Sequence, residues 1–226
     1  MPIICADFFK QCKNISSDSV DLILTDPPYG INYRNGLSKK QKNIKIMNDG
    51  IDEIDWNIFF EECYRILKDR KTLYIFGRTD MFLRIAKFII ESQFRYVHDF
   101  IWFKGDMGYG NLNIMGTTHE MIICLSKNSP EKSRIVNGKK RVPAYYKGKV
   151  STKEYVGHPV QKPIELLKYI ILNRTDENDI ILDPFAGVGS VEIAAKQLNR
   201  KCISCEIEQK WVDIAIKRIN ETAKCN

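Results

Sequence analysis

The chain has 226 residues, a formal net charge of +7, 44% hydrophobic residues and 28% charged residues. This length suits one compact core with little left for a second large domain, and the composition excludes disordered and fibrous classes. No apolar run approaches the length of a membrane span, and the N-terminus lacks the features of a signal peptide. We therefore expect a cytoplasmic protein without a membrane partner.

The positive charge is concentrated in one part of the chain. Residues 126–157 contain nine basic and two acidic residues, an excess equal to the net charge of the whole chain. A basic window of this kind suits a polyanionic partner.

The seven cysteines are odd in number, and most fall in predicted strands or helices. This pattern predicts reduced, buried thiols rather than a disulfide framework. Cys202 and Cys205 lie in a predicted strand, where residues three apart point to opposite faces, and no second pair completes a metal set. We expect no metal.

Strand and helix patterns alternate along the chain. Short aliphatic runs predict seven strands, over residues 2–5, 20–25, 72–76, 94–103, 120–125, 179–182 and 201–206. Apolar residues at helical spacing predict helices over residues 7–14, 56–67, 81–91, 163–173, 191–199 and 210–222. This alternation predicts a doubly wound, mainly parallel, seven-stranded α/β sheet with ligands along its carboxyl edge.

Asp26, Pro27, Pro28 and Tyr29 follow directly after the predicted buried strand 20–25. The prolines cannot donate hydrogen bonds, so this loop presents bare carbonyls beside one carboxylate and one aromatic ring. Such a set fits a planar substrate that bears an amino group. A Pro-Pro turn with a capping Asp and a packed Tyr is the alternative for these residues alone.

A glycine turn follows the predicted strand 179–182, with the sequence Asp183-Pro184-Phe185-Ala186-Gly187-Val188-Gly189-Ser190. Glycines allow a ligand close to the backbone, and the next helix begins with an electropositive end. Glu206, at the end of the following strand, is suited to ribose hydroxyls. A dehydrogenase is disfavoured because Glu192 stands where a third glycine belongs, and no Lys-Ser or Lys-Thr indicates a P-loop.

These two motifs resemble the D-P-P-Y and D-P-F-x-G-x-G-[ST] motifs of S-adenosylmethionine-dependent amino-methyltransferases, which methylate adenine N6 or cytosine N4. Their order along the chain resembles the β group of this family, a permuted arrangement common among DNA methyltransferases. The resemblance covers nearly the whole chain and implies a permuted, Rossmann-like class I methyltransferase fold.

The resemblance also assigns residues to the cofactor. His158, Pro159, Gln161 and Lys162 match the H-P-x-Q-K-P motif, for which a polar start of a helix is the alternative. Asp7 matches an acidic position near the cofactor's adenine, or caps a helix. The implied cofactor set is Asp7, Asp26, His158, Pro159, Gln161, Lys162, Asp183, Pro184, Phe185, Ala186, Gly187, Gly189, Ser190, Glu206 and Ile207. Segments 102–104 and 119–120 resemble late motifs of the family.

The remaining basic segments are assigned to double-stranded DNA. The polar loop 30–50 leaves the catalytic strand directly, and its alternative is a solvated loop. The expected DNA contacts are Arg34, Lys39, Lys40, Lys42, Lys139, Lys140, Arg141, Tyr145, Tyr146 and Lys147. We expect a catalytic half over residues 1–125, a small recognition segment over 126–157 and a cofactor half over 158–226.

Within the family, adenine-N6 enzymes carry Asp at position 26, whereas many cytosine-N4 enzymes carry Ser. We therefore predict a prokaryotic or phage adenine-N6 DNA methyltransferase that flips its target base out of the duplex. A cytosine-N4 enzyme is the alternative, followed by an RNA or protein amide methyltransferase. A homodimer and a cognate restriction endonuclease stay open as partners.

Overall fold

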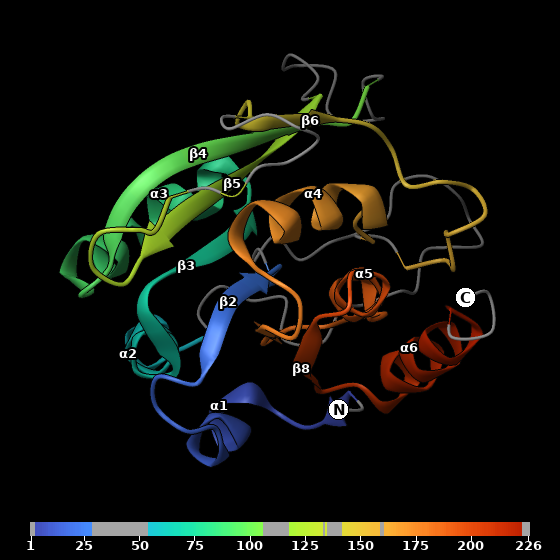
Figure 1. Ribbon diagram of the computed structural model, residues 1–226, viewed down its shortest axis with the longest axis horizontal. Coiled ribbons are helices and arrows are strands. Elements are labelled where there is room, and N and C mark those ends of the chain that lie inside the picture. The colour runs from blue at the N-terminus through green and yellow to red at the C-terminus, as the bar shows by residue number, and fades with distance from the viewer. Residues whose placement is uncertain are drawn as a thin grey trace.

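The computed structural model describes residues 3–28, 54–105, 118–132, 134, 142–158 and 161–222. Its centre is one eight-stranded sheet in the order β1-β8-β7-β2-β3-β5-β4-β6 (Figure 1). The strands are β1 (Ile4–Cys5), β2 (Val20–Thr25), β3 (Leu67–Gly77), β4 (Arg95–Phe103), β5 (His119–Ser126), β6 (Tyr145–Lys147), β7 (Ile180–Asp183) and β8 (Lys201–Glu206). β5 runs antiparallel to β3 and β4, and the other pairs are parallel.

Helices cover both faces of the sheet (Figure 1). They are α1 (Phe8–Gln11), α2 (Trp56–Ile66), α3 (Thr79–Glu91), α4 (Ile164–Arg174), α5 (Ser190–Gln197) and α6 (Gln209–Thr222). Alternation along β2 separates the two cores: Ile23 packs with α1, α2 and α3, whereas Leu22 and Leu24 pack with α4 and α5. The predicted doubly wound, mainly parallel fold is therefore confirmed.

The predicted number of strands was wrong by one. Tyr145–Lys147 forms the eighth strand, parallel to β4, with Ile101 opposite Tyr145 and Phe103 opposite Lys147. Three residues in a basic stretch carry no alternating apolar pattern, and the pairing comes from a neighbour more than forty residues earlier in the chain. Part of the basic window thus belongs to the main sheet.

Five of the six described cysteines are buried, as expected from the sequence, whereas Cys5 is exposed. Cys202 packs in the core under α4 and α5, and Cys205 packs in the opposite core. All six cysteines within the described ranges are free thiols. None of the helices in these ranges is long and apolar enough to cross a membrane.

Asp21 links the parallel strands β2, β3 and β7 by hydrogen bonds near their amino ends. Its buried carboxylate accepts hydrogen bonds from Lys68 Nζ at 2.8 and 2.9 Å and from the Ile180 backbone N–H at 3.0 Å. β2, β3 and β7 are therefore held in register at the edge opposite the predicted site.

We predict that Asp21→Ala lowers the free energy of unfolding by about 3 kcal/mol, because it leaves a buried N–H and a lysine without their acceptor. Urea denaturation measures this loss. The matched control, Asp69→Ala, removes an exposed carboxylate of β3 and is expected to change the value by less than about 1 kcal/mol. Equal losses in both variants would contradict the role assigned to Asp21.

Candidate active site

Four acidic residues lie at one edge of the sheet, each at or just beyond the carboxyl end of a strand. Because β1, β8, β7 and β2 are adjacent and parallel, Asp7, Glu206, Asp183 and Asp26 follow one another along this edge. Neighbouring strands are roughly 4.8 Å apart, so the row spans about 14 Å. This is the edge at which open α/β sheets bind ligands.

Asp183 is fully enclosed at the end of β7 and is 3% exposed. Its Oδ1 accepts a hydrogen bond from the Phe185 backbone N–H at 3.2 Å. Burial, with added repulsion from Asp26 and Glu206, raises the pKa of Asp183 to about 8. This carboxyl is therefore mostly protonated near pH 7 and is able to donate a hydrogen bond.

The glycine turn after β7 wraps around the end of β8. Gly187 and Gly189 have φ of 51° and 73°, values that favour glycine. A Cβ on Gly189 would lie 3.0 Å from the Ala215 Cβ of α6, so a larger residue is also excluded by space. The turn therefore brings bare backbone to the sheet edge.

Glu206 is fixed by backbone donors on both sides. Its Oε2 accepts from the Gly187 N–H at 2.9 Å, and its Oε1 accepts from the Glu208 N–H at 2.8 Å. Burial raises the pKa of Glu206, although these two N–H groups act in the opposite direction. The carboxylate is oriented before any ligand arrives.

His158 closes the turn from the other side. Its ring packs edge-on against Trp211 at 4.5 Å and lies next to Gly187. Burial lowers the pKa of His158 to about 4, with Lys162, Arg218 and Lys210 adding to the effect. His158 Nδ1 is buried and has no hydrogen-bond partner among the described residues. A neutral imidazole therefore lies beside the glycine turn.

Gln161 and Arg218 hold the backbone segments that form the site. Gln161 accepts from the Val156 N–H at 3.1 Å and donates to the Glu154 carbonyl at 2.7 Å, which holds the segment leading to His158. Arg218 of α6 donates to the Val188 carbonyl and to Ser190 Oγ. Sequence reasoning missed Arg218, because it is one of several basic residues on an amphipathic helix and matches no motif.

A charged cluster includes Asp26, just beyond the end of β2. The ammonium group of Lys162 is ion-paired with Asp26 and lies 3.6 Å from Glu120 Oε2, while Lys104 is paired with Glu120 Oε1. Lys162 is 5% exposed, and its ammonium lies 5.2 Å from the centre of the Phe76 ring. The structure thus joins residues that the sequence analysis had distributed among four segments of the chain.

Opposite charges keep this cluster ionised. Burial alone would lower the pKa of Lys162, but the carboxylates of Asp26 and Glu120 outweigh it and raise that pKa. Burial alone would raise the pKa of Glu120, but Lys162 and Lys104 outweigh it and lower that pKa. Two ammonium groups and two carboxylates therefore balance one another.

The other predicted residues are less uniform in their surroundings. Asp7 accepts from the Phe9 N–H at 2.9 Å as the cap of α1, so it serves as a helix cap as well as lying beside Glu206. Phe185 stacks on Phe59 of α2 with ring centres 6.1 Å apart and therefore contributes to the core. Pro27, Pro184 and Ala186 are buried, Pro28 is half-buried, and Ile207 is exposed. Tyr29, Arg34, Lys39, Lys40, Lys42, Lys139, Lys140, Arg141 and Pro159 lie outside the described residues.

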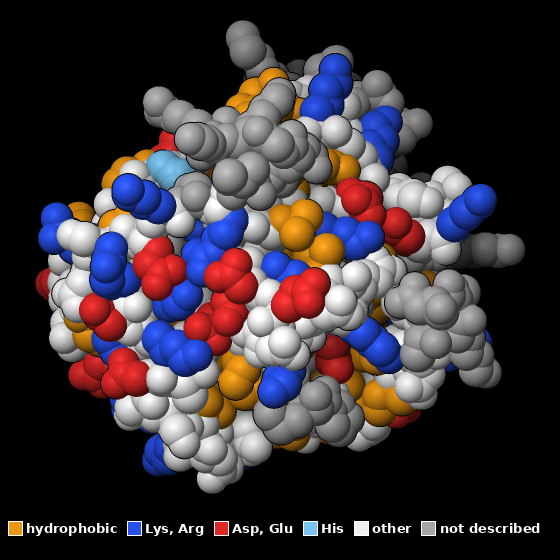
Figure 2. All heavy atoms as spheres, viewed as in Figure 1, with side chains coloured by type: hydrophobic (Ala, Val, Ile, Leu, Met, Phe, Trp, Pro, Cys, Tyr) orange, Lys and Arg blue, Asp and Glu red, His pale blue; other side chains and the backbone are white. Residues whose placement is uncertain are grey.

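Tyr145, Tyr146 and Lys147 lie on the edge strand β6, at the opposite end of the sheet from β1. Tyr145 is exposed, and Tyr146 is half-buried against Tyr169. Figure 2 shows Lys or Arg side chains at the upper edge of the molecule near β6, whereas basic and acidic side chains are intermixed over the rest of this face. Lys127 and Arg134 of the same window instead form ion pairs with Asp18 and Asp176.

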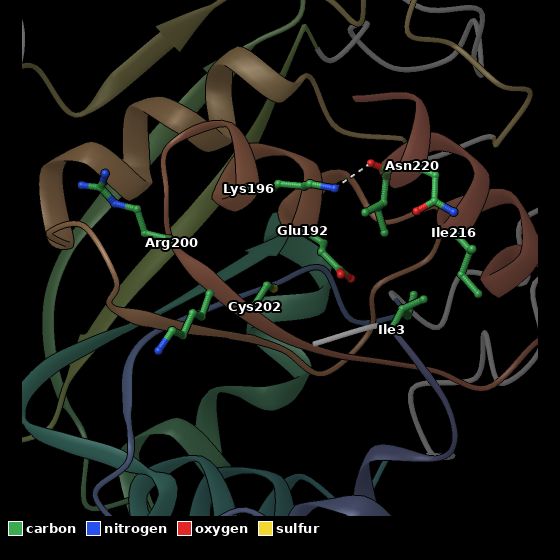
Figure 3. A pocket seen from close by; sticks show the side chains of 9 residues that line it. Ile3, Glu192, Lys196, Arg200, Cys202, Ile216 and Asn220 are labelled. Carbon is green, nitrogen blue, oxygen red and sulfur yellow. Dashed lines mark hydrogen bonds between the residues drawn. The ribbon is translucent and has the colours of Figure 1, made fainter. Parts of the chain in front are cut away.

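A separate cavity of about 410 Å³ lies between β8, α5 and α6 (Figure 3). Glu192, Lys196 and Cys202 are among its lining residues. Glu192 already accepts from Ser204 Oγ at 2.7 Å, and Lys196 donates to the Ile219 carbonyl at 3.0 Å. None of the predicted cofactor residues lines this cavity. Within the described residues, no cluster of ligating side chains forms a metal site.

Comparison with known proteins gives consistent results. The family model described as DNA methylase matches residues 20–217. The type II methyltransferase M.HpaI of Haemophilus parainfluenzae is 30% identical over 237 residues, covering 96% of this chain and 74% of the relative. The DNA adenine methyltransferase YhdJ of Escherichia coli strain K12 is 29% identical over 259 residues, covering 96% of this chain and 82% of the relative.

Solved structures match the whole fold. The structure of M1.HpyAVI in complex with SAM gives a TM-score of 0.71 at 27% identity, covering 96% of this chain and 98% of that one. The cytosine-N4-specific PvuII DNA methyltransferase gives a TM-score of 0.77 at 17% identity, covering 98% and 90%, a likeness that shows the fold alone. The chain therefore belongs to the N6/N4 DNA methylase family and is a DNA amino-methyltransferase that uses S-adenosyl-L-methionine.

Proposed function

We propose that this protein transfers a methyl group to the N6 amino group of a flipped adenine in double-stranded DNA. The observation that carries this proposal is the Asp26 carboxylate, held by Lys162 at the end of β2 and adjacent to the acidic row of β7 and β8. Aspartate at this position is typical of the adenine enzymes in the family. The name of the relative YhdJ, an adenine methyltransferase, supports the same target.

The residues along β1, β8 and β7 fit the cofactor. The glycine turn allows close approach, Glu206 presents a fixed carboxylate for ribose hydroxyls, and His158 Nδ1 has no partner within the described part of the chain. We assign Asp7 and Glu206 to the adenosine portion, and Asp183 with His158 to the region nearer the sulfur. When bound, S-adenosylmethionine supplies an electrophilic methyl group on a sulfonium centre.

Asp26 acts on the target amine. The lone pair of an exocyclic amine is delocalised into the ring, so the amine is a weak nucleophile. When Asp26 and a carbonyl of Pro27 or Pro28 accept its two N–H groups, the lone pair localises on nitrogen, and the hydrogen bonds strengthen as positive charge develops there. The nitrogen would form its bond to the methyl carbon as the bond from that carbon to the sulfonium sulfur breaks, with the electron pair left on sulfur, and the nitrogen would lose one proton to the Asp26 carboxylate. Tyr29 is assigned to stacking on the base.

Cytosine N4 is the second candidate, because the family model covers both chemistries and the fold matches a cytosine-N4 enzyme. Both bases present an exocyclic amine beside a ring nitrogen, so Asp26 serves either one. Discrimination between them has to come from the size of the pocket and from contacts beyond the catalytic motif.

We assign DNA positioning to the basic segments, with residues 126–157 as the recognition segment between the catalytic half 1–125 and the cofactor half 158–226. Lys147 and Tyr145 lie exposed on β6, where they are suited to contact phosphates and bases. Since relatives are named type II methyltransferases, a companion restriction endonuclease belongs to the proposal, and the small recognition segment favours a homodimer.

We predict that Glu206→Ala weakens S-adenosylmethionine binding about 10- to 100-fold, because a charged hydrogen-bond acceptor is lost from the cofactor edge. Isothermal titration calorimetry measures the dissociation constant. Asp213→Ala, which removes an exposed carboxylate of α6, serves as the control and is expected to bind normally. Unchanged affinity in Glu206→Ala would refute the assigned cofactor edge.

We predict that Asp26→Asn reduces the rate of methyl transfer about 100-fold or more while the cofactor still binds, because a neutral amide is a weaker acceptor and cannot take the proton. Unmethylated DNA is incubated with labelled S-adenosylmethionine, digested to nucleosides and separated by chromatography. The wild type should place its label in N6-methyladenine. Label in N4-methylcytosine would overturn the choice of base, and full activity of Asp26→Asn would overturn the catalytic role.

Lys149 is exposed two residues beyond β6 and lies beside Lys147 in the sequence of the basic window. We predict that the double variant Lys147→Glu and Lys149→Glu weakens DNA binding and lowers the slope of log affinity against log salt by about 2, as expected when two phosphate contacts are lost. Fluorescence anisotropy at several salt concentrations measures this slope. Lys87→Glu with Lys217→Glu makes the same change of charge at exposed sites on α3 and α6. An equal effect of both pairs would show general charge repulsion instead of a DNA-binding edge.

A further inference from the structure

Lys162 connects two acidic residues that come from different strands. It lies two residues before Ile164, the first residue of α4, whereas Asp26 follows β2 and Glu120 belongs to β5. Its ammonium is paired with Asp26 and lies within ion-pair distance of Glu120, at 3.6 Å. The side chains of Lys162 and Glu120 are both at least nine-tenths buried.

The ammonium group of Lys162 lies outside the edge assigned to the cofactor. The cofactor edge runs along β1, β8 and β7, whereas Lys162 faces the ends of β2 and β5, with the Phe76 ring of β3 below its ammonium. Burying an ammonium group is costly unless carboxylates lie close to it, and Lys162 has two such partners. Lysine and carboxylates therefore hold one another in place.

We propose that Lys162 is a positioning residue that fixes the Asp26 carboxylate, in ionised form, against the target amine. This inference rests on the proposed function, because it concerns the same transfer reaction. It moves Lys162 from the cofactor set to the support of the catalytic carboxylate. Lys104, paired with Glu120, completes a chain of alternating charges from β4 to β2.

The charged groups around Asp26 determine the direction of the expected effect. Glu120 of β5 and Asp183 of β7 face it as acids, Glu206 of β8 lies beyond Asp183, and His158 and Lys104 complete the surroundings. When Lys162 is removed, Asp26 loses its paired positive charge while the Glu120 carboxylate remains nearby, so its pKa rises. A protonated Asp26 is a weaker acceptor for the amine and cannot take up the proton that the amine loses. Activity should therefore recover as the pH increases and Asp26 ionises.

Lys162→Gln tests the proposal in the full-length protein with unmethylated DNA and labelled S-adenosylmethionine. We expect kcat at pH 7 to fall at least about 10-fold, with the acid limb of the kcat profile shifted to higher pH, while the dissociation constant for the cofactor changes less than about 2-fold. Lys162→Arg, which keeps the charge, should restore most of the activity. Lys168→Gln removes a lysine of α4 that pairs with Glu165 at the surface, and it should behave as wild type.

The opposite pattern would overturn the inference: weaker cofactor binding with an unchanged kcat and an unshifted pH profile. Lys162→Met, of similar length without charge, replaces the glutamine variant if that protein does not fold. A ¹³C-carboxyl NMR titration, with Asp26 identified by the signal lost in Asp26→Asn, tests the ion pair without any methyl transfer. A wild-type Asp26 that is protonated at neutral pH would contradict the pairing, whereas an ionised Asp26 in a protein that fails to methylate DNA would contradict only the proposed reaction.

Discussion

The parallel pairing of β1, β8, β7 and β2 is the constraint on which the rest of this protein depends. Parallel strands end at one edge, so residues far apart in the sequence, from Asp7 to Glu206, are collected into one row. Asp21 maintains this alignment from the other edge by bonding to β3 and β7. A shift of one residue in β7 would turn Asp183 away from the row, because side chains alternate between faces.

Several acidic side chains at a partly buried edge destabilise the folded protein, because burial and mutual repulsion disfavour their charged forms. The structure offsets this cost differently for each acid. Asp183 is held as a neutral acid by burial, Glu206 is surrounded by backbone N–H groups, and Asp26 is paired with a lysine. These three solutions give three chemical properties: a donor, a fixed acceptor for hydroxyls and an ionised acceptor for an amine. Under the proposed function, one edge therefore binds the cofactor on one side and activates the target base on the other.

Most of the fold was predictable because long apolar strands and amphipathic helices carry clear periodicity. The site residues at the ends of β2, β7 and β8 were predictable because their motifs follow those strands directly. Tyr145–Lys147 was not, because a short edge strand is defined by its partner β4. The contact between Lys162 and Asp26 joins residues 136 positions apart, and the role of Arg218 depends on the packing of α6 against the glycine turn. Such pairings arise from the tertiary structure and leave no local pattern.

The most direct test of this account is a crystal structure with S-adenosylhomocysteine and a DNA duplex that carries the methylated site. The account predicts the ribose at the Glu206 carboxylate and a flipped adenine whose amino group lies within hydrogen-bond distance of Asp26, with Lys162 still paired to that carboxylate. A cofactor bound in the cavity beside Glu192 and Cys202, or a target amine held away from Asp26, would contradict it.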